Sequence, residues 1–168
     1  MQIKKNANSA QSLIATAGFF WDAEHVTWGG KNKKGKLEGV PSSAKKACPI
    51  DFSDQVGIYV LYAEYKIVYV GQTGKGRQAL LKRLRAHRTD DLAGRWDKFS
   101  WFGVRRVLKN GTLSKKNAVF HPSLIDVLDQ VEGILIHSAE PPLNRQQGRL
   151  KKKVTRYLQD VKQEPKKT

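Results

Sequence analysis

Arg83 and His87 are the first side chains whose types and spacing suggest chemistry. Residues 78–88 show helical spacing, with three leucines on one face and with Arg83 and His87 one turn apart at the edge of that face. A guanidinium presents a planar pair of donors that matches a phosphate, and an imidazole can bind a phosphate oxygen or transfer a proton. Residue type and spacing alone leave two alternatives open, namely a phosphate-binding pair or a structural Arg with a partly buried structural His.

Glu132 is the second such residue. The segment 123–137 is predicted to be a helix, because Pro122-Ser123 is a start signal and Pro141-Pro142 a stop signal. Glu132 falls within the apolar stripe of that helix, which consists of Leu124, Ile125, Leu128, Val131, Leu135 and Ile136. Burying an unpaired carboxylate costs several kcal/mol, so Glu132 is expected to have a cationic partner. That partner is either an arginine in a buried ion pair or a hard divalent cation.

Two tripeptides precede these helices. Two β-rich runs, 56–63 and 67–70, are predicted to pair as a hairpin. The first contains Gly57-Ile58-Tyr59, and Tyr69-Val70-Gly71 closes the second, which ends at Gly71. With Arg83, His87, Glu132 and Asn144 following in order, the chain resembles the GIY-YIG endonuclease superfamily over roughly residues 56–145. The step from Glu132 to Asn144 looks like the spacing in the nuclease domain of the bacterial excision-repair incision protein. GIY-YIG restriction and homing endonucleases share the pattern.

The resemblance implies a fold and domain boundaries. The expected fold class is α+β, a small three-stranded antiparallel sheet flanked by helices, with an N-terminal extension and a basic C-terminal tail. The nuclease domain is expected over 51–148, after a basic, aromatic-containing extension over 1–50 and before a basic helix or tail over 149–168. The aromatic residues at 19–28 are expected to pack on the core rather than to stack on bases, and the Gly/Lys stretch 29–36 is expected to be a mobile loop.

The resemblance also assigns roles to the site residues. Tyr59 is the candidate general base, although a phenol needs nearby cations to lower its pKa from about 10. Tyr69 orients the water or the phosphate, and Arg83 binds the scissile phosphate. The implied reaction is hydrolysis of a DNA phosphodiester bond with one Mg²⁺ or Mn²⁺, in which Glu132 holds the metal. His87 assists at the phosphate, and Asn144 orients the cluster.

Two departures from the family pattern leave alternatives. The stretch Gly74-Lys75-Gly76-Arg77 is an insertion, so the arginine position could instead be Arg77 or Arg85, and helical placement favours Arg83. Gln72 stands where several relatives have Lys, with Lys66 or Lys75 as possible substitutes.

The charge of the chain points to a polyanionic partner. Lys and Arg number 31 against 15 Asp and Glu, which gives a net charge of +16, and the excess is greatest toward the two ends. DNA is the expected partner, with double strands favoured and single strands possible. The residues expected to contact it are Lys75, Arg77, Lys82, Arg145, Arg149, Lys151, Lys152 and Lys153. The alternatives are a noncatalytic nucleic-acid-binding module that retains the same fold and a ribosome-type RNA binder.

Other classes find little support in the sequence. A single cysteine, Cys48, favours a reducing compartment, and a cytoplasmic location is expected. No window has the length and apolarity of a membrane span. Gly71–Arg77 lacks the Gly-Lys-Ser/Thr ending of a phosphate-binding P-loop, and four scattered histidines have no zinc-ligand spacing. Neither the target sequence nor the oligomeric state follows from the sequence.

Overall fold

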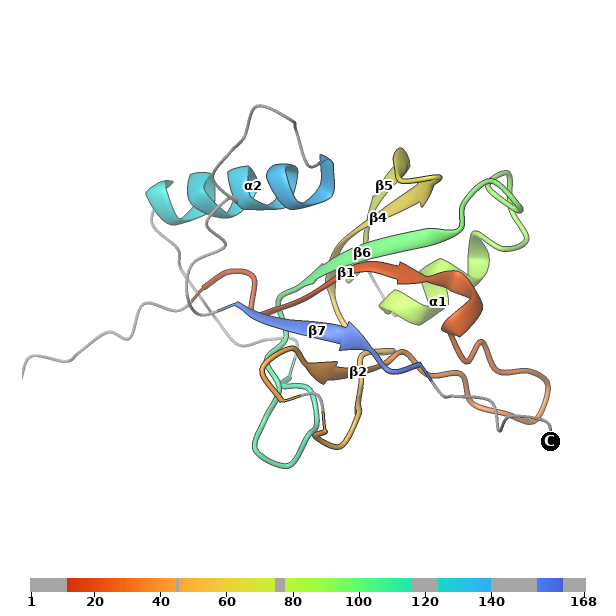
Figure 1. Ribbon diagram of the computed structural model, residues 1–168, viewed down its shortest axis with the longest axis horizontal. Coiled ribbons are helices and arrows are strands. Elements are labelled where there is room, and N and C mark those ends of the chain that lie inside the picture. The colour runs from red at the N-terminus through yellow and green to blue at the C-terminus, as the bar shows by residue number, and fades with distance from the viewer. Residues whose placement is uncertain (1–11, 45, 75–77, 116–123, 140–153, 162–168) are drawn as a thin grey trace, which may run out of the picture.

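The computed structural model describes residues 12–44, 46–74, 78–115, 124–139 and 154–161, with side chains of the last helix described from Gln130 onward. One sheet organises these residues (Figure 1). Its strands are β1 (Thr16–Asp22), β2 (Glu38–Pro41), β3 (Ile50–Asp51), β4 (Gly57–Ala63), β5 (Lys66–Gln72), β6 (Lys98–Gly103) and β7 (Thr155–Gln159). Two α-helices, α1 (Leu80–Ala86) and α2 (Leu124–Ala139), and the 3-10 turn η1 (Ala23–His25) complete the described elements.

The predicted fold class is wrong. The strands form a seven-stranded mixed sheet in the order β3-β2-β7-β1-β6-β4-β5, rather than a small three-stranded antiparallel sheet. The predicted hairpin is confirmed, since β4 and β5 pair antiparallel with Tyr59 opposite Gly71. β6 lies antiparallel on the other side of β4, so these three strands form one end of the larger sheet. The error arose because strands from both ends of the chain extend it.

The segments expected to flank the domain are part of the sheet. β1 and β2 come from the expected N-terminal extension, and β1 pairs with β6 across the middle of the sheet. β7 lies where a basic helix or tail was expected, parallel to β1 and antiparallel to β2. Tyr157 of β7 is buried. The expected boundaries near 50 and 149 therefore do not separate the sheet from its flanks.

Alternation along β4 divides the core between the two faces of the sheet. Tyr59 and Leu61 point to one face, where α1 inserts its three leucines beside the indoles of Trp21 and Trp101. Trp21 and Trp101 pack edge to face with ring centroids 5.4 Å apart, which confirms the prediction that the N-terminal aromatic residues join the core. The other face carries a second cluster, against which Ile134 of α2 packs. The two helices thus cover opposite faces.

Candidate functional site

Three polar side chains form a hydrogen-bonded chain at the end of α1. The Tyr59 hydroxyl lies 2.7 Å from Nε2 of His87, and Nδ1 of His87 lies 2.7 Å from Oδ2 of Asp90. A neutral imidazole that donates its Nδ1 proton to the Asp90 carboxylate has a free lone pair on Nε2. Nε2 then accepts the hydrogen bond from the Tyr59 hydroxyl. These two hydrogen bonds therefore orient Nε2 of His87 so that it can accept a proton from the Tyr59 hydroxyl.

Tyr69 and Arg83 complete this group, which we call the tyrosine cluster (Tyr59, Tyr69, Arg83, His87 and Asp90). The Tyr69 ring packs edge to face on the His87 imidazole at 4.9 Å and lies 6.1 Å from the Tyr59 ring. Arg83 interacts with the hydroxyls of both tyrosines. Its Nε is buried, and it has no hydrogen-bond partner among the residues that the structure describes. A phosphate oxygen would satisfy that donor.

The backbone shapes the cluster through Gly71, which stands opposite Tyr59 in the hairpin. A Cβ atom at position 71 would lie 2.8 Å from Cε1 of Tyr59 and nearer still to Cζ and the hydroxyl oxygen. Only glycine lets the buried phenol lie this close to β5. The glycine of the second tripeptide therefore has a direct steric role in placing the Tyr59 hydroxyl.

Burial and charge act in opposite directions on Tyr59. Burial raises its pKa, and Arg83 lowers it through a hydrogen bond and through its charge, but the net effect is a raised pKa. Arg83 thus lowers the pKa of Tyr59, as expected of a nearby cation, but by less than burial raises it. Tyr59 is a neutral phenol at pH 7, so it can act as a base only by passing its own proton to His87 as it receives another.

Asp90 is a member of the candidate site that the sequence prediction missed. The backbone N–H of Leu92 lowers the pKa of its carboxyl group, and the hydrogen bond from His87 lowers it further. Asp90 is therefore an anion at neutral pH and holds the His87 tautomer. One signal was available, because an acid three residues after a histidine at a helix end lies within its reach.

Glu132 lies apart from the cluster, which corrects the prediction that its stripe is buried. Its side chain is exposed, and so are Val131 and Leu135, at 48% and 62%. The buried side of α2 carries Gln130, Ser138 and, stacked on Phe19 at 4.9 Å, His137. The predicted helix is confirmed, but Val131 and Leu135 of its apolar stripe do not lie on the side of the helix that meets the sheet. Because α2 covers the face opposite Tyr59, Glu132 and the tyrosine cluster lie on different faces.

The Mg²⁺ that the resemblance implies would need oxygen ligands. Within the described ranges, no three His, Cys, Asp or Glu side chains are grouped so that they could hold a metal ion. In the tyrosine cluster the one carboxylate is Asp90, whose two oxygens accept hydrogen bonds from His87 and Leu92. The described arrangement of Glu132 and the cluster therefore does not fit the predicted metal site.

The remaining predicted residues divide into two sets. Lys82 is exposed on α1, as a DNA contact requires. Arg85, the alternative to Arg83, instead donates a hydrogen bond to the carbonyl of Trp28. Outside the described residues lie Asn144, Lys75, Arg77, Arg145, Arg149, Lys151, Lys152 and Lys153. Of the arginines that are described, Arg83 is the one that meets Tyr59.

Comparison of the chain with protein-family models, with curated proteins and with solved structures gives no match. Among the helices that the structure describes, none has the length and apolarity needed to cross a membrane. The functional argument therefore rests on the geometry of the tyrosine cluster and on the charge of the chain.

Proposed function

We propose that this protein is an endonuclease that hydrolyses DNA phosphodiester bonds at the tyrosine cluster. The observation that carries the proposal is the Tyr59–His87–Asp90 hydrogen-bond chain beside Arg83. The net charge of +16 supports a polyanionic substrate. The resemblance of the two tripeptides to those of GIY-YIG nucleases supports the same reaction class.

Each residue of the tyrosine cluster can have a separate role in hydrolysis. Arg83 binds a non-bridging phosphate oxygen through its buried Nε–H, and Tyr69, which is partly exposed, borders the approach to Tyr59. A water molecule gives a proton to the Tyr59 oxygen as Tyr59 gives its own proton to Nε2 of His87. The water oxygen bonds to phosphorus, the bond from phosphorus to the 3′ oxygen breaks, and the 3′ oxygen leaves with the bonding electron pair and takes a proton from solvent. Asp90 stabilises the imidazolium that forms.

A noncatalytic nucleic-acid-binding module is the second candidate. The placement of Glu132 on the opposite face favours it, because the cluster then lacks the carboxylate that the resemblance assigns to the metal. Full burial of Tyr59 points the same way, since the phenol must become accessible to water before it can react.

The test is incubation of the full chain with supercoiled plasmid and with labelled single-stranded DNA, in Mg²⁺ or in EDTA. We expect cutting by the wild type, a loss of about 100-fold or more in His87→Ala, and retained DNA binding in that variant. Salt-sensitive binding without cutting in every condition would leave the binding module as the function. Glu132→Gln tests whether Glu132 is a metal ligand. The resemblance predicts that this variant loses cutting, whereas the exposed position of Glu132 predicts an unchanged cleavage rate.

A further inference from the structure

The stretch 27–36, which we call the lysine loop, is the most basic exposed segment among the described residues. Lys31, Lys33, Lys34 and Lys36 are exposed, and the segment contains no acidic residue. An ion pair joins Lys36 to Glu38 at 3.2 Å. The three other lysines lie toward the tip, between Gly30 and Gly35. The loop therefore presents a group of cations to solvent.

Backbone contacts close the base of this loop. Thr27 and Lys36 form a backbone bridge, as do Gly30 and Lys33 nearer the tip. Gly35 is buried, and a Cβ atom there would lie 2.5 Å from the Trp28 carbonyl and 2.7 Å from Nη2 of Arg85. The base of the loop is thus closed by backbone contacts that leave no room for a side chain.

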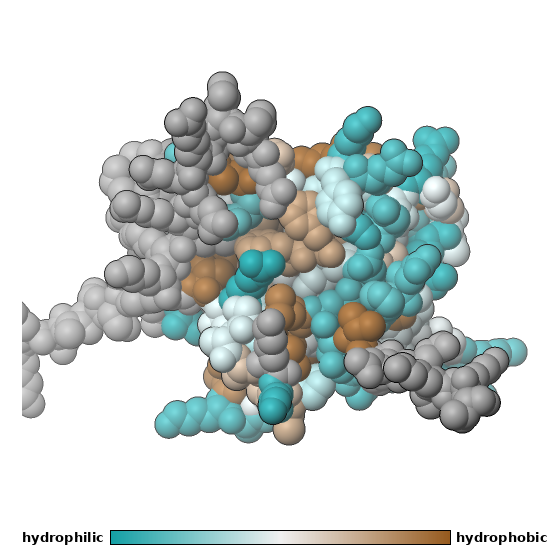
Figure 2. Space-filling model, in the orientation of Figure 1, coloured by the Kyte–Doolittle hydropathy of each residue, from teal (hydrophilic) through white to brown (hydrophobic). Residues whose placement is uncertain are grey.

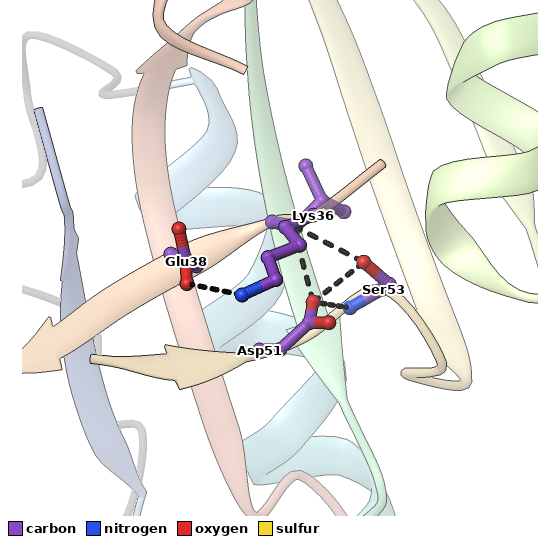
Figure 3. Close-up of polar contacts among 5 residues, drawn as sticks. Lys36, Glu38, Asp51 and Ser53 are labelled. Carbon is purple, nitrogen blue, oxygen red and sulfur yellow. Dashed lines mark hydrogen bonds and ion pairs between the residues drawn. The ribbon is translucent and has the colours of Figure 1, made fainter. Parts of the chain in front are cut away.

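The C-terminal end of the loop is fixed to β3 (Figure 3). The Asp51 carboxylate accepts hydrogen bonds from the backbone N–H of Leu37 at 3.1 Å and of Ser53 at 2.9 Å. The Ser53 hydroxyl accepts a second bond from Leu37, at 3.1 Å. Figure 3 shows the Lys36 side chain extending from this junction toward Glu38. Because the backbone at this end of the loop is anchored, less conformational entropy is lost when the loop lysines bind a ligand.

The loop also docks on α1, the helix that carries Arg83 and His87. Arg85 donates a hydrogen bond to the carbonyl of Trp28, and the Arg88 guanidinium lies over the Trp28 ring at 4.6 Å. Trp28 packs edge to face on Trp96 at 6.1 Å, and the Trp96 indole donates to the His87 carbonyl at 3.1 Å. The lysine loop and the tyrosine cluster are therefore attached to the same helix.

Helical geometry places the loop and the cluster on opposite flanks of α1. At 3.6 residues per turn, Arg83 and His87 lie on one side of the buried leucines, and Arg85 lies on the other. Lys82 lies on the side of the helix opposite the buried leucines and is exposed. Figure 2 shows hydrophilic side chains gathered at the right of the view, the side on which α1 lies in Figure 1. Lys82 and Arg85 are thus exposed cations on α1 between the cluster and the lysine loop.

We propose that the lysine loop binds the phosphate backbone of the DNA that the tyrosine cluster cuts, a few nucleotides from the scissile bond. The width of α1 with its side chains is about 10 Å, and one strand of duplex carries a phosphate about every 3.4 Å along the axis, so about three nucleotides cross it. This inference rests on the proposed function for its substrate. It assigns DNA binding to residues of the N-terminal segment, separate from the basic C-terminal stretch.

The test measures binding of the full chain to a labelled duplex of mixed sequence, in EDTA, across a range of salt. The variant is Lys31→Ala/Lys33→Ala/Lys34→Ala, and the control is Arg106→Ala/Lys109→Ala/Lys115→Ala, three exposed cations in another loop with the same loss of charge. If each loop lysine neutralises one phosphate, the slope of log affinity against log salt falls by about 2.7 in the variant. Between about 50 and 200 mM salt, the fall in affinity is then about 40-fold smaller than in the wild type.

The control variant distinguishes a direct contact between the lysine loop and DNA from the general effect of removing three positive charges. We expect the control variant to keep the wild-type slope to within about 0.9. An unchanged slope in the lysine-loop variant would overturn the inference, as would equal reductions in the two variants. If wild-type protein cuts plasmid while either of these results holds, the inference fails and the proposed function stands. A wild type that binds anionic vesicles but not DNA would overturn both.

Discussion

The contact between Gly71 and Tyr59 gives a prediction about a single methyl group. In Gly71→Ala the new Cβ atom would lie 2.8 Å from Cε1 of Tyr59 and nearer to the hydroxyl, whereas ordinary contact begins at 3.4 Å. Measured from the nearest atoms, Cζ and the hydroxyl oxygen, the ring or strand β5 must therefore retreat by about 1 Å. Because Tyr59 is fully buried, the strain has few routes of relief.

The cost can be worked out in two parts. Overpacking of a core site typically costs about 1 to 3 kcal/mol. Loss of the 2.7 Å hydrogen bond from Tyr59 to His87 adds about 1 kcal/mol. We therefore expect Gly71→Ala to lower the free energy of unfolding by about 2 to 4 kcal/mol, and to lower the cleavage rate by displacing the Tyr59 hydroxyl.

Gly30→Ala is the matched control, because a Cβ atom at position 30 meets nothing within 4 Å. It should change the free energy of unfolding by no more than about 0.5 kcal/mol. Urea denaturation of the two variants beside the wild type measures both changes, and cleavage of plasmid measures the effect on activity. If Gly71→Ala were as stable and as active as Gly30→Ala, the described approach of Tyr59 to β5 would be wrong.

Three further predictions follow from the cluster and the sheet. Asp90→Asn keeps an acceptor for the Leu92 N–H but removes the anion beside His87, so the cleavage rate should fall about 100-fold while the folded fraction stays unchanged, as measured by single-turnover kinetics and circular dichroism. Because the pKa of Tyr59 is raised in the folded protein, the phenol ionises at lower pH in the unfolded chain than in the folded one. The free energy of unfolding should therefore decrease as the pH rises above about 10, and it should decrease less in Tyr59→Phe. Equal decreases in urea melts of the two proteins would contradict this. Tyr157→Ala should cost about 3 to 5 kcal/mol in thermal or urea unfolding, because Tyr157 is buried in a strand between β2 and β1; a cost near zero is the result expected of a solvated tail.

The sequence was informative where neighbouring residues determine the structure. The β4–β5 hairpin and α1 follow from local patterns, and those elements alone bring Tyr59 and Tyr69 to Arg83 and His87. The proximity of these four side chains needs only a hairpin and the helix that follows it. A prediction of this kind depends on short-range spacing, which a single sequence carries well.

Long-range pairing was not predictable in the same way. β7 aligns Tyr157 with Gly18 of β1, far away in the chain, and its five residues come from a lysine-rich segment that resembles a solvated tail. The orientation of α2 failed for a related reason. Its stripe of apolar residues is real, but which side of a helix meets the sheet depends on the residues already on that face, including Phe19 and Phe102.

The most direct test of the account compares two variants that each remove one buried hydroxyl from β4. Tyr59→Phe removes the hydroxyl that faces His87, and Tyr62→Phe removes one on the opposite face of the same strand. In single-turnover cleavage of DNA with Mg²⁺, we predict a loss of about 100-fold or more in Tyr59→Phe and a rate within about threefold of wild type in Tyr62→Phe. Wild-type cleavage by Tyr59→Phe would contradict the claim that the tyrosine cluster performs the reaction.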